Sequence, residues 1–348
     1  MRRLLATAAA SCLALGLVAC SSDAADTAED AVTFSDGDNV VNLYTSRHYD
    51  VDKELYEMFR EKTGLELNVV EGKSDELIER INREKAAPAA DLLLTVGAES
   101  IAQLKNNDLI EETTSPTLES SIDPKYRGDD WVGLMARARV LAYNKDTVDP
   151  ATLTTYESIT APEFKGKVLA RSSSSSYNQA LLASFIDLWG EEKATEWAQG
   201  VVDNFAREPK GNDIDQAKAV AAGEGDVAIM NSYYWARLAN SSDPEDAKVT
   251  EKVGLVFPEN THMNLSYGAL LKGAKHKENA IKFLEFMASP EVQEKIAKEN
   301  GEFPLNPQVT LPEPQASWGK FTTQDLDFAT FGNNKPEATI IFDKVGWK

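Results

Sequence analysis

The sequence predicts an α/β fold of two lobes that are joined by two crossover strands and separated by a cleft. Three observations lead to this prediction. The 348 residues are enough for two domains, each with a core of its own. Short apolar runs alternate with stretches of helical periodicity, an order typical of a parallel sheet covered by helices. A longer apolar stretch at 131–144 then breaks the alternation, and we expect it to cross from one lobe to the other.

The N-terminus has the features of an export signal. Arg2 and Arg3 precede an uncharged stretch at 4–17 that is too short to span a bilayer. The letters LVAC at 17–20 resemble a bacterial lipobox, in which Cys20 becomes the lipidated first residue. We therefore predict a signal peptide at 1–19 and a flexible lipoprotein tether at 20–38, rich in Ser, Ala, Asp and Thr.

The first lobe is predicted from six short elements that begin near Asn39. Apolar runs favour strands, and apolar residues at helical spacing favour helices between them. Gly64 is expected to stop the first helix. The predicted strands are 40–45, 65–70 and 92–96, and the predicted helices are 52–62, 75–85 and 100–106.

The second lobe is predicted from the elements after the crossover at 131–144. We expect strands at 167–170 and 227–230, one long helix over 178–205, return-crossing strands at 253–257 and 269–271, and an amphipathic helix at 279–288. The predicted lobes are 39–134 plus 259–310 and 135–258 plus 311–348. Arg137 and Arg139 lie two positions apart in the crossover strand, and a surface position on one face is the ordinary expectation for both.

The composition restricts the ligand. There are 36 basic and 56 acidic residues and a formal net charge of -20, which becomes -22 once Arg2 and Arg3 leave with the signal. This charge argues against nucleic acid or an anionic membrane surface and favours a cation. Cys12 also leaves with the signal and Cys20 carries lipid, so no thiol remains for a disulfide, a zinc finger or an iron-sulfur cluster.

Oxygen ligands are what the chain offers a metal. Its three histidines, His48, His262 and His276, form no HExxH motif, so an ordinary zinc site is not expected. A phenol ionises near pH ~10, but a trivalent iron can displace the phenol proton. Adjacent Tyr233 and Tyr234 could serve one ion only on a turn that follows the strand 227–230 and enters a helix, because strand neighbours point to opposite faces.

Five stretches carry a resemblance across residues 40–348. The chain resembles the periplasmic binding protein of bacterial iron(III) ABC transporters, in the group that includes the cyanobacterial and Campylobacter ferric-binding proteins. The stretches occur in the family's order: VNLYTSRHYD at 41–50, RARVLAYN at 137–144, SSYNQALLAS at 175–184, GDVAIMNSYYWARL at 225–238 and NGEFPLNP at 300–307.

The resemblance implies a type II periplasmic-binding-protein fold that binds Fe3+ in its cleft and performs no catalysis. It implies the partners and location of such a protein: an ABC permease and ATPase, a lipid anchor as the only membrane attachment, and a monomer at the outer face of the cytoplasmic membrane or in the periplasm. The implied metal ligands are His48, Tyr49, Tyr177, Tyr233 and Tyr234. Glu71, Asp75 and Glu76 lie where some related groups use a carboxylate, but we do not expect them to bind the metal.

Charge balance calls for a cation near such a site. Four tyrosinates around one Fe3+ sum to -1, so a fixed positive charge is expected to hold the phenols ionised. Arg137 is the first candidate, since it lies on the crossover strand and matches the family's position behind the ligands. Arg47 and Arg237 are weaker candidates, because they are close in sequence to His48 and Tyr234.

Two other classes of function stay open from the residues alone. A binder of a small oxyanion could use the serine run at 172–176 and the arginines, because hydroxyls and free N–H groups at a helix start hold anions. An exported hydrolase could use a serine near Tyr177 with His48. The hydrolase reading lacks a GxSxG elbow and an identifiable carboxylate to orient the base.

Overall fold

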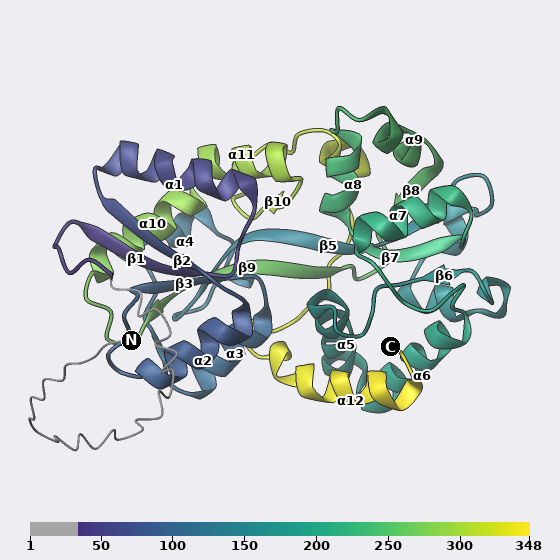
Figure 1. Cartoon of the computed structure of the whole chain (residues 1–348), viewed down its shortest axis with the longest axis horizontal. Coiled ribbons are helices and arrows are strands. Elements are labelled where there is room, and N and C mark those ends of the chain that lie inside the picture. The colour runs from purple at the N-terminus through teal and green to yellow at the C-terminus, as the bar shows by residue number, and fades with distance from the viewer. Residues whose placement is uncertain (1–33) are drawn as a thin grey trace, which may run out of the picture. The chain divides into compact units, whose positions relative to one another are not determined.

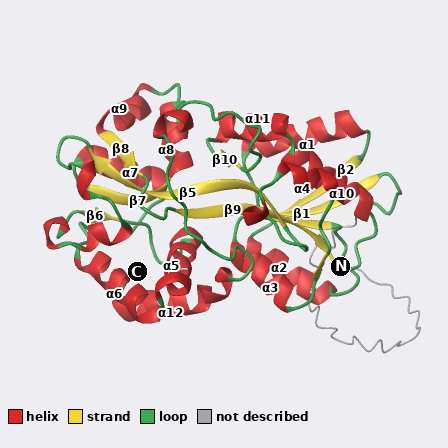
Figure 2. Cartoon of the chain, turned by 180° about the vertical axis from the view of Figure 1, so that it is seen from behind, coloured by secondary structure: helices red, strands yellow, loops and turns green. Residues whose placement is uncertain are grey.

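A single curled sheet runs through residues 34–348, the part of the chain that the computed structural model describes (Figure 1). Its strand order is β2-β1-β3-β9-β5-β7-β6, with β4 on β9 and with β8 and β10 on β5. Helices cover both faces of the sheet (Figure 2). The mixed α/β fold that the sequence predicts is therefore present.

The first lobe contains the predicted βαβαβα order. Its parallel strands are β1 (Val40–Thr45), β2 (Glu66–Glu71) and β3 (Leu92–Thr95). Its helices are α1 (Asp50–Thr63), α2 (Ser74–Glu84) and α3 (Ala98–Asn106). Gly64 ends α1 in the left-handed region at a φ of 70°, where glycine carries no Cβ penalty.

Two long antiparallel strands, β5 (Val132–Asn144) and β9 (His262–Leu271), lie side by side and run through both lobes (Figure 1). At one end β9 pairs with β3, and at the other end β5 pairs with β7. This confirms a crossover at 131–144. The prediction for the return crossing was partly wrong: β9 begins at His262, because its polar residues are buried inside the molecule, and β8 (Val253–Val256) pairs with β5 within the second lobe.

The second lobe surrounds β6 (Val168–Leu169) and β7 (Val227–Asn231). The single helix predicted over 178–205 was wrong. Gly190, at a φ of 83°, separates two helices, because a left-handed residue cannot continue a right-handed helix. The helices here are α5 (Ser176–Trp189), α6 (Glu191–Asp203), α7 (Asp213–Ala222), α8 (Ser232–Ala239) and α9 (Pro244–Lys252).

The remaining elements complete the cover of the sheet. The predicted amphipathic helix is α10, and its buried stripe includes Phe283 and Leu284. The other elements are β4 (Ile110–Glu111), α4 (Pro116–Ser121), α10 (Lys277–Ala288), α11 (Pro290–Asn300), β10 (Phe303–Pro304) and α12 (Lys335–Val345). Short 3-10 turns lie at Pro124–Tyr126, Pro150–Thr152, Tyr156–Thr160, Pro162–Phe164, Gln315–Trp318 and Phe331–Asn334.

The predictions for the N-terminus fall largely outside the described residues. The signal peptide at 1–19, the lipidation of Cys20 and the tether up to residue 33 lie there. From Phe34 the chain contacts the sheet: the Phe34 ring lies 5.6 Å from the ring of Tyr44, and the Ser35 carbonyl accepts a hydrogen bond from Asn42. Phe34–Lys348 forms one compact unit, and the exact lobe boundaries stay a prediction. None of the helices described between residues 34 and 348 is long and apolar enough to cross a membrane.

Candidate metal centre

The four predicted tyrosine ligands and the predicted histidine line one cavity of about 530 Å³. They come from three segments that are far apart in the sequence. One segment is the junction of β1 and α1, the second is the start of α5, and the third is the start of α8. The residues that the cavity brings together are His48, Tyr49, Tyr177, Tyr233 and Tyr234.

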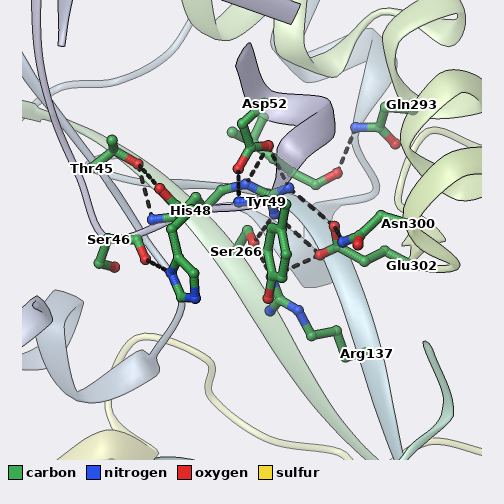
Figure 3. Close-up of polar contacts among 12 residues, drawn as sticks. Thr45, Ser46, His48, Tyr49, Asp52, Arg137, Ser266, Gln293, Asn300 and Glu302 are labelled. Atoms are coloured by element: carbon green, nitrogen blue, oxygen red, sulfur yellow. Dashed lines mark hydrogen bonds and ion pairs between the residues drawn. The ribbon is translucent and has the colours of Figure 1, made fainter. Parts of the chain in front are cut away.

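His48 and Tyr49 lie at the carboxyl end of β1, where open α/β sheets place ligands. Tyr49 is the N-cap of α1, and its backbone N–H donates to Asp52 Oδ2 at 3.1 Å. The His48 ring stacks on the Tyr49 ring with centroids 5.5 Å apart. His48 Nδ1 lies 3.2 Å from the carbonyl oxygen of Ser46, which leaves Nε2 as its second nitrogen. Figure 3 shows both side chains extending from this junction.

Tyr177 approaches Tyr49 from the second lobe. It lies in the first turn of α5, and its hydroxyl is 3.5 Å from the Tyr49 hydroxyl. A separation of this size places two phenol oxygens at the distance of a weak hydrogen bond, and also at a distance that one bound cation could bridge.

Tyr233 and Tyr234 occupy the position that the sequence required of them. They lie in the first turn of α8, directly after β7, with Asn231 at the N-cap. Their ring centroids are 4.0 Å apart, and the Tyr233 ring meets the edge of the Tyr49 ring at 6.0 Å. A helix start lets neighbouring side chains face one cavity, which strand geometry does not allow.

Burial keeps these phenols protonated when nothing is bound. It raises the pKa of Tyr49, Tyr233 and Tyr234 above the usual value, and the neighbouring phenols raise the pKa of Tyr49 and Tyr233 further. Arg137 opposes the rise at Tyr49 and Tyr233. A cation that binds through these oxygens must therefore displace their protons.

Behind Tyr49 lies a buried network of two arginines and two carboxylates (Figure 3). Arg47 pairs with Asp52 at 2.9 Å and with Glu302 at 3.0 Å, and Arg137 pairs with Glu302 at 2.7 Å. Burial alone would raise the pKa of Glu302, but Arg137 and Arg47 outweigh it and lower the pKa to about 2. The guanidinium carbons of Arg47 and Arg137 lie 4.8 Å and 5.6 Å from the centroid of the Tyr49 ring.

A third buried arginine lies behind Tyr177. Arg139 pairs with Asp213 at 2.7 Å and donates to Asn178 Oδ1 at 2.6 Å. Arg139 and Arg171 each place a guanidinium carbon 5.9 Å from the centroid of the Tyr177 ring. The expectation that Arg137 and Arg139 lie on the surface was wrong: both are fully buried, because their strand lies inside the sheet, and each has a carboxylate partner.

Sequence reasoning missed the polar residues that surround the tyrosines. Glu302 is part of the quoted stretch NGEFPLNP, and its position there is the only sequence signal for it. Arg139 lies two residues after Arg137, and two arginines in an otherwise apolar strand were a signal for buried ion pairs. Asp213 and Arg171 had no local signal. The missed residues near the tyrosines are Asp52, Arg139, Arg171, Asn178, Asp213 and Glu302.

The remaining residues named from the sequence lie in this cavity or beside it. Arg237 lines the cavity from an exposed position on α8. Glu71, Asp75 and Glu76 line a neighbouring cavity of about 640 Å³, which shares His48 with the first. Within residues 34–348, no three His, Cys, Asp or Glu side chains are grouped so that they could hold a metal ion.

The serine run contributes little to the cavity. The hydroxyls of Ser172 and Ser174 lie 2.7 Å apart and pair with each other, and Ser176 is the member of the run that lines the cavity. The hydroxyl of Ser175 is buried and has no hydrogen-bond partner among the described residues. His48 Nδ1 faces the backbone carbonyl of Ser46 rather than a serine hydroxyl.

Comparison with known proteins gives the family. Residues 54–323 match the model of the bacterial extracellular solute-binding proteins. The chain belongs to this family. Two relatives are the iron uptake proteins A1 and A2 of Synechocystis, both 42% identical; A1 aligns over 88% of this chain and 87% of its own length, and A2 over 88% and 90%.

Solved structures of family members share the fold. A Trichodesmium protein described as IdiA or FutA in complex with iron and citrate is 44% identical, covers 89% of this chain and 100% of its own, and superposes with a TM-score of 0.83. The ferric-binding protein of Campylobacter jejuni is 38% identical over 88% of this chain and 100% of its own, with a TM-score of 0.82. The type II periplasmic-binding-protein fold is therefore confirmed.

Proposed function

We propose that this protein binds ferric iron in the cavity between its lobes and delivers it to an ABC-type iron importer. The observation that carries the proposal is the convergence of four phenol groups from three separate segments on one cavity. In this proposal Tyr49, Tyr177, Tyr233 and Tyr234 bind the ion as tyrosinates, and His48 completes the ligand set through a ring nitrogen.

The donor chemistry favours Fe3+ over a divalent ion. Phenols of raised pKa hold their protons at neutral pH, and a hard trivalent ion competes with those protons far better than a divalent one. Four tyrosinates and one Fe3+ leave a charge of -1. Guanidinium groups beside the Tyr49 and Tyr177 rings are placed to stabilise the phenolates: Arg137, which the sequence favours, and Arg139 and Arg171, which the fold adds. Each of these arginines is paired with a carboxylate, so it stabilises the phenolates only in part.

The relatives support the same cargo. The Synechocystis proteins are named for iron uptake, and proteins of two Neisseria species that are 25% identical are named major ferric iron-binding proteins. We infer an exported binding protein without catalytic activity, whose partners are an ABC permease and an ATPase. Lipidation at Cys20, attachment at the outer face of the cytoplasmic membrane or release into the periplasm, and a monomeric state are parts of the proposal.

The oxyanion alternative has less support. It needs the hydroxyls of the serine run, and Ser172 and Ser174 already pair with each other. The Synechocystis and Neisseria relatives are named for iron, whereas a structure from Actinobacillus pleuropneumoniae with bound fructose-6-phosphate is only 22% identical and supports the fold alone. A protonated phenol can donate one hydrogen bond to an anion, but it supplies no fixed positive charge.

A visible spectrum tests the proposal. Ferric iron supplied as a weak chelate should give the purified protein a phenolate-to-iron charge-transfer band. A variant with Phe at Tyr177, Tyr233 and Tyr234 should lose the band and the bound iron while it keeps its ring packing. Equal iron binding by both proteins would overturn the site, and a wild type that binds no iron would overturn the function.

A further inference from the structure

The carboxylate of Glu302 holds together both arginines that face Tyr49. Its side chain is fully buried in the turn between α11 and β10. Arg47 donates to Oε1 at 3.1 Å and to Oε2 at 3.0 Å, and Arg137 lies 2.7 Å from Oε1. Asn300 donates to Oε2 at 2.7 Å. Glu302 itself is not among the residues that line the cavity.

Glu302 determines the net charge behind Tyr49. Arg47 and Arg137 carry two positive charges, and Asp52 and Glu302 carry two negative charges, so the buried network is neutral. Both guanidinium groups lie within 6 Å of the Tyr49 ring centroid. Arginine keeps its proton in proteins, so a change at Glu302 cannot be absorbed by loss of an arginine proton.

Arg137 depends on few other groups. Its Nη2 donates to Ser266 Oγ at 2.6 Å, while Nε and Nη1 are buried and have no hydrogen-bond partner among the described residues. Glu302 is thus its charged partner in the network of Arg47, Arg137, Asp52 and Glu302. Neutral Glu302 would leave one unbalanced positive charge in a buried place beside the Tyr49 ring, where screening by water is weak.

We propose that Glu302 is a positioning residue that limits how tightly the cavity retains iron. It fixes the two guanidinium groups against Tyr49 and cancels one of their charges, so that the Tyr49 phenolate is stabilised only in part and the iron can be handed to the importer. This inference rests on the proposed function. The inference predicts a direction of effect that differs from that of a purely structural role. Removal of the Glu302 charge alone should make iron binding tighter, whereas a structural defect would make it weaker.

The test compares Glu302→Gln with Glu302→Asp. Gln keeps the size and removes the charge, and Asp keeps the charge on a shorter arm. Iron-loaded proteins are titrated with citrate at one fixed pH, and loss of the charge-transfer band is followed. Glu302→Gln should need roughly tenfold more citrate than wild type, the scale that Coulomb's law gives for one charge roughly 10 Å away at an effective dielectric of about 20.

The band position and the second variant add independent readouts. In Glu302→Gln the band should move to shorter wavelength, because extra positive charge beside the phenolate ring stabilises the donor orbital more than the iron. In Glu302→Asp the citrate midpoint should stay within about threefold of wild type. Asp91→Asn is the matched control. Asp91 is a buried carboxylate just before the first residue of β3, at the end of the strand away from the cavity. The band and the citrate midpoint of this variant should equal those of wild type.

Weaker or unchanged iron retention in Glu302→Gln would overturn the inference. If this variant does not fold, Asp52→Asn removes a charge from the same network at the other partner of Arg47 and should tighten retention to a smaller extent; weaker or unchanged retention there would overturn the inference equally. Failure of the proposed function is distinguishable, because wild type itself would then show no charge-transfer band.

Discussion

The hydroxyl of Tyr49 lies 3.5 Å from the hydroxyl of Tyr177, although 128 positions separate the two residues in the chain. Tyr49 follows a strand of the first lobe, and Tyr177 begins a helix of the second lobe. A cation held by both oxygens would link the two lobes directly. Because one of these ligands comes from each lobe, a metal site here depends on how the two lobes pack together.

Replacement of Tyr234 by Phe should lower iron affinity by at least tenfold with little change in the melting temperature of the iron-free protein. The ring contact with Tyr233 is kept, and only the oxygen donor is lost. Calorimetry of the iron-free protein and chelator competition of the loaded protein measure the two effects. Tyr143→Phe is the control, because Tyr143 lies on β5 and does not line the cavity; equal losses in both variants would contradict the assignment.

Replacement of Arg137 by Gln should move iron release to higher pH. Burial raises the pKa of Tyr49 and Tyr233, and Arg137 opposes this rise. Without the arginine the phenol pKa values rise further, so protons displace iron at a lower proton concentration. The midpoint is read from the charge-transfer band during acid titration. An unchanged midpoint would assign Arg137 to structure and the charge balance to the other arginines beside the phenols, Arg47, Arg139 and Arg171.

The iron-free protein should lose stability as the pH falls from about 6.5 to 4, and His262 should account for part of the loss. Burial lowers the pKa of His262 to about 4, so over this range the unfolded chain takes up a proton that the folded chain refuses. The ordinary histidine pKa lies near 6.5, and its difference from the pKa of about 4 in the folded protein corresponds to about 3 kcal/mol of unfolding free energy.

Urea unfolding of wild type and His262→Gln at pH 7 and pH 4.5 measures the histidine's share. The Gln side chain can still pair with Gln324 and Asn264, the present neighbours of the ring. The variant should lose less stability between the two pH values than wild type does. A parallel decrease in both proteins would show that His262 is not the titrating group.

Replacement of Cys20 by Ser should abolish incorporation of a clickable fatty acid into the expressed protein. The lipobox interpretation makes Cys20 the acylated residue, and one acyl chain alone holds a protein at a membrane only weakly, so several chains are implied. Gel fluorescence of cells grown with the probe gives the result. Cys12→Ser is the control and should label like wild type; continued labelling of the Cys20 variant would rule out this anchor.

The sequence predicts the elements of the fold well where periodicity is strong and poorly where tertiary contacts decide. The strand at Val40–Thr45 and the helix ended by Gly64 follow from local pattern. The break at Gly190 was missed because a glycine inside an apolar periodic stretch is compatible with one helix. The early start of β9 was missed because His262 and Asn264 are polar, and only burial beside β5 makes them strand residues.

The site was predictable in its donors and not in its surroundings. Tyr233 and Tyr234 stand out in the sequence as a pair. The sequence also predicts that they can bind one ion only if they follow a strand and begin a helix, and in the structure they lie there. The partners of Arg137 could not be predicted, because Glu302 is 165 positions away and reaches it only through the packing of the turn after α11 onto β5. Long-range ion pairs leave no periodic trace in the chain.

A crystal structure of the iron-loaded protein, with anomalous data collected at the iron absorption edge, tests the central claim most directly. The account predicts one iron peak within bonding distance of the phenol oxygens of Tyr49, Tyr177, Tyr233 and Tyr234, with Arg137 still paired to Glu302 behind it. An iron peak that is bound by none of Tyr177, Tyr233 and Tyr234 would contradict the account.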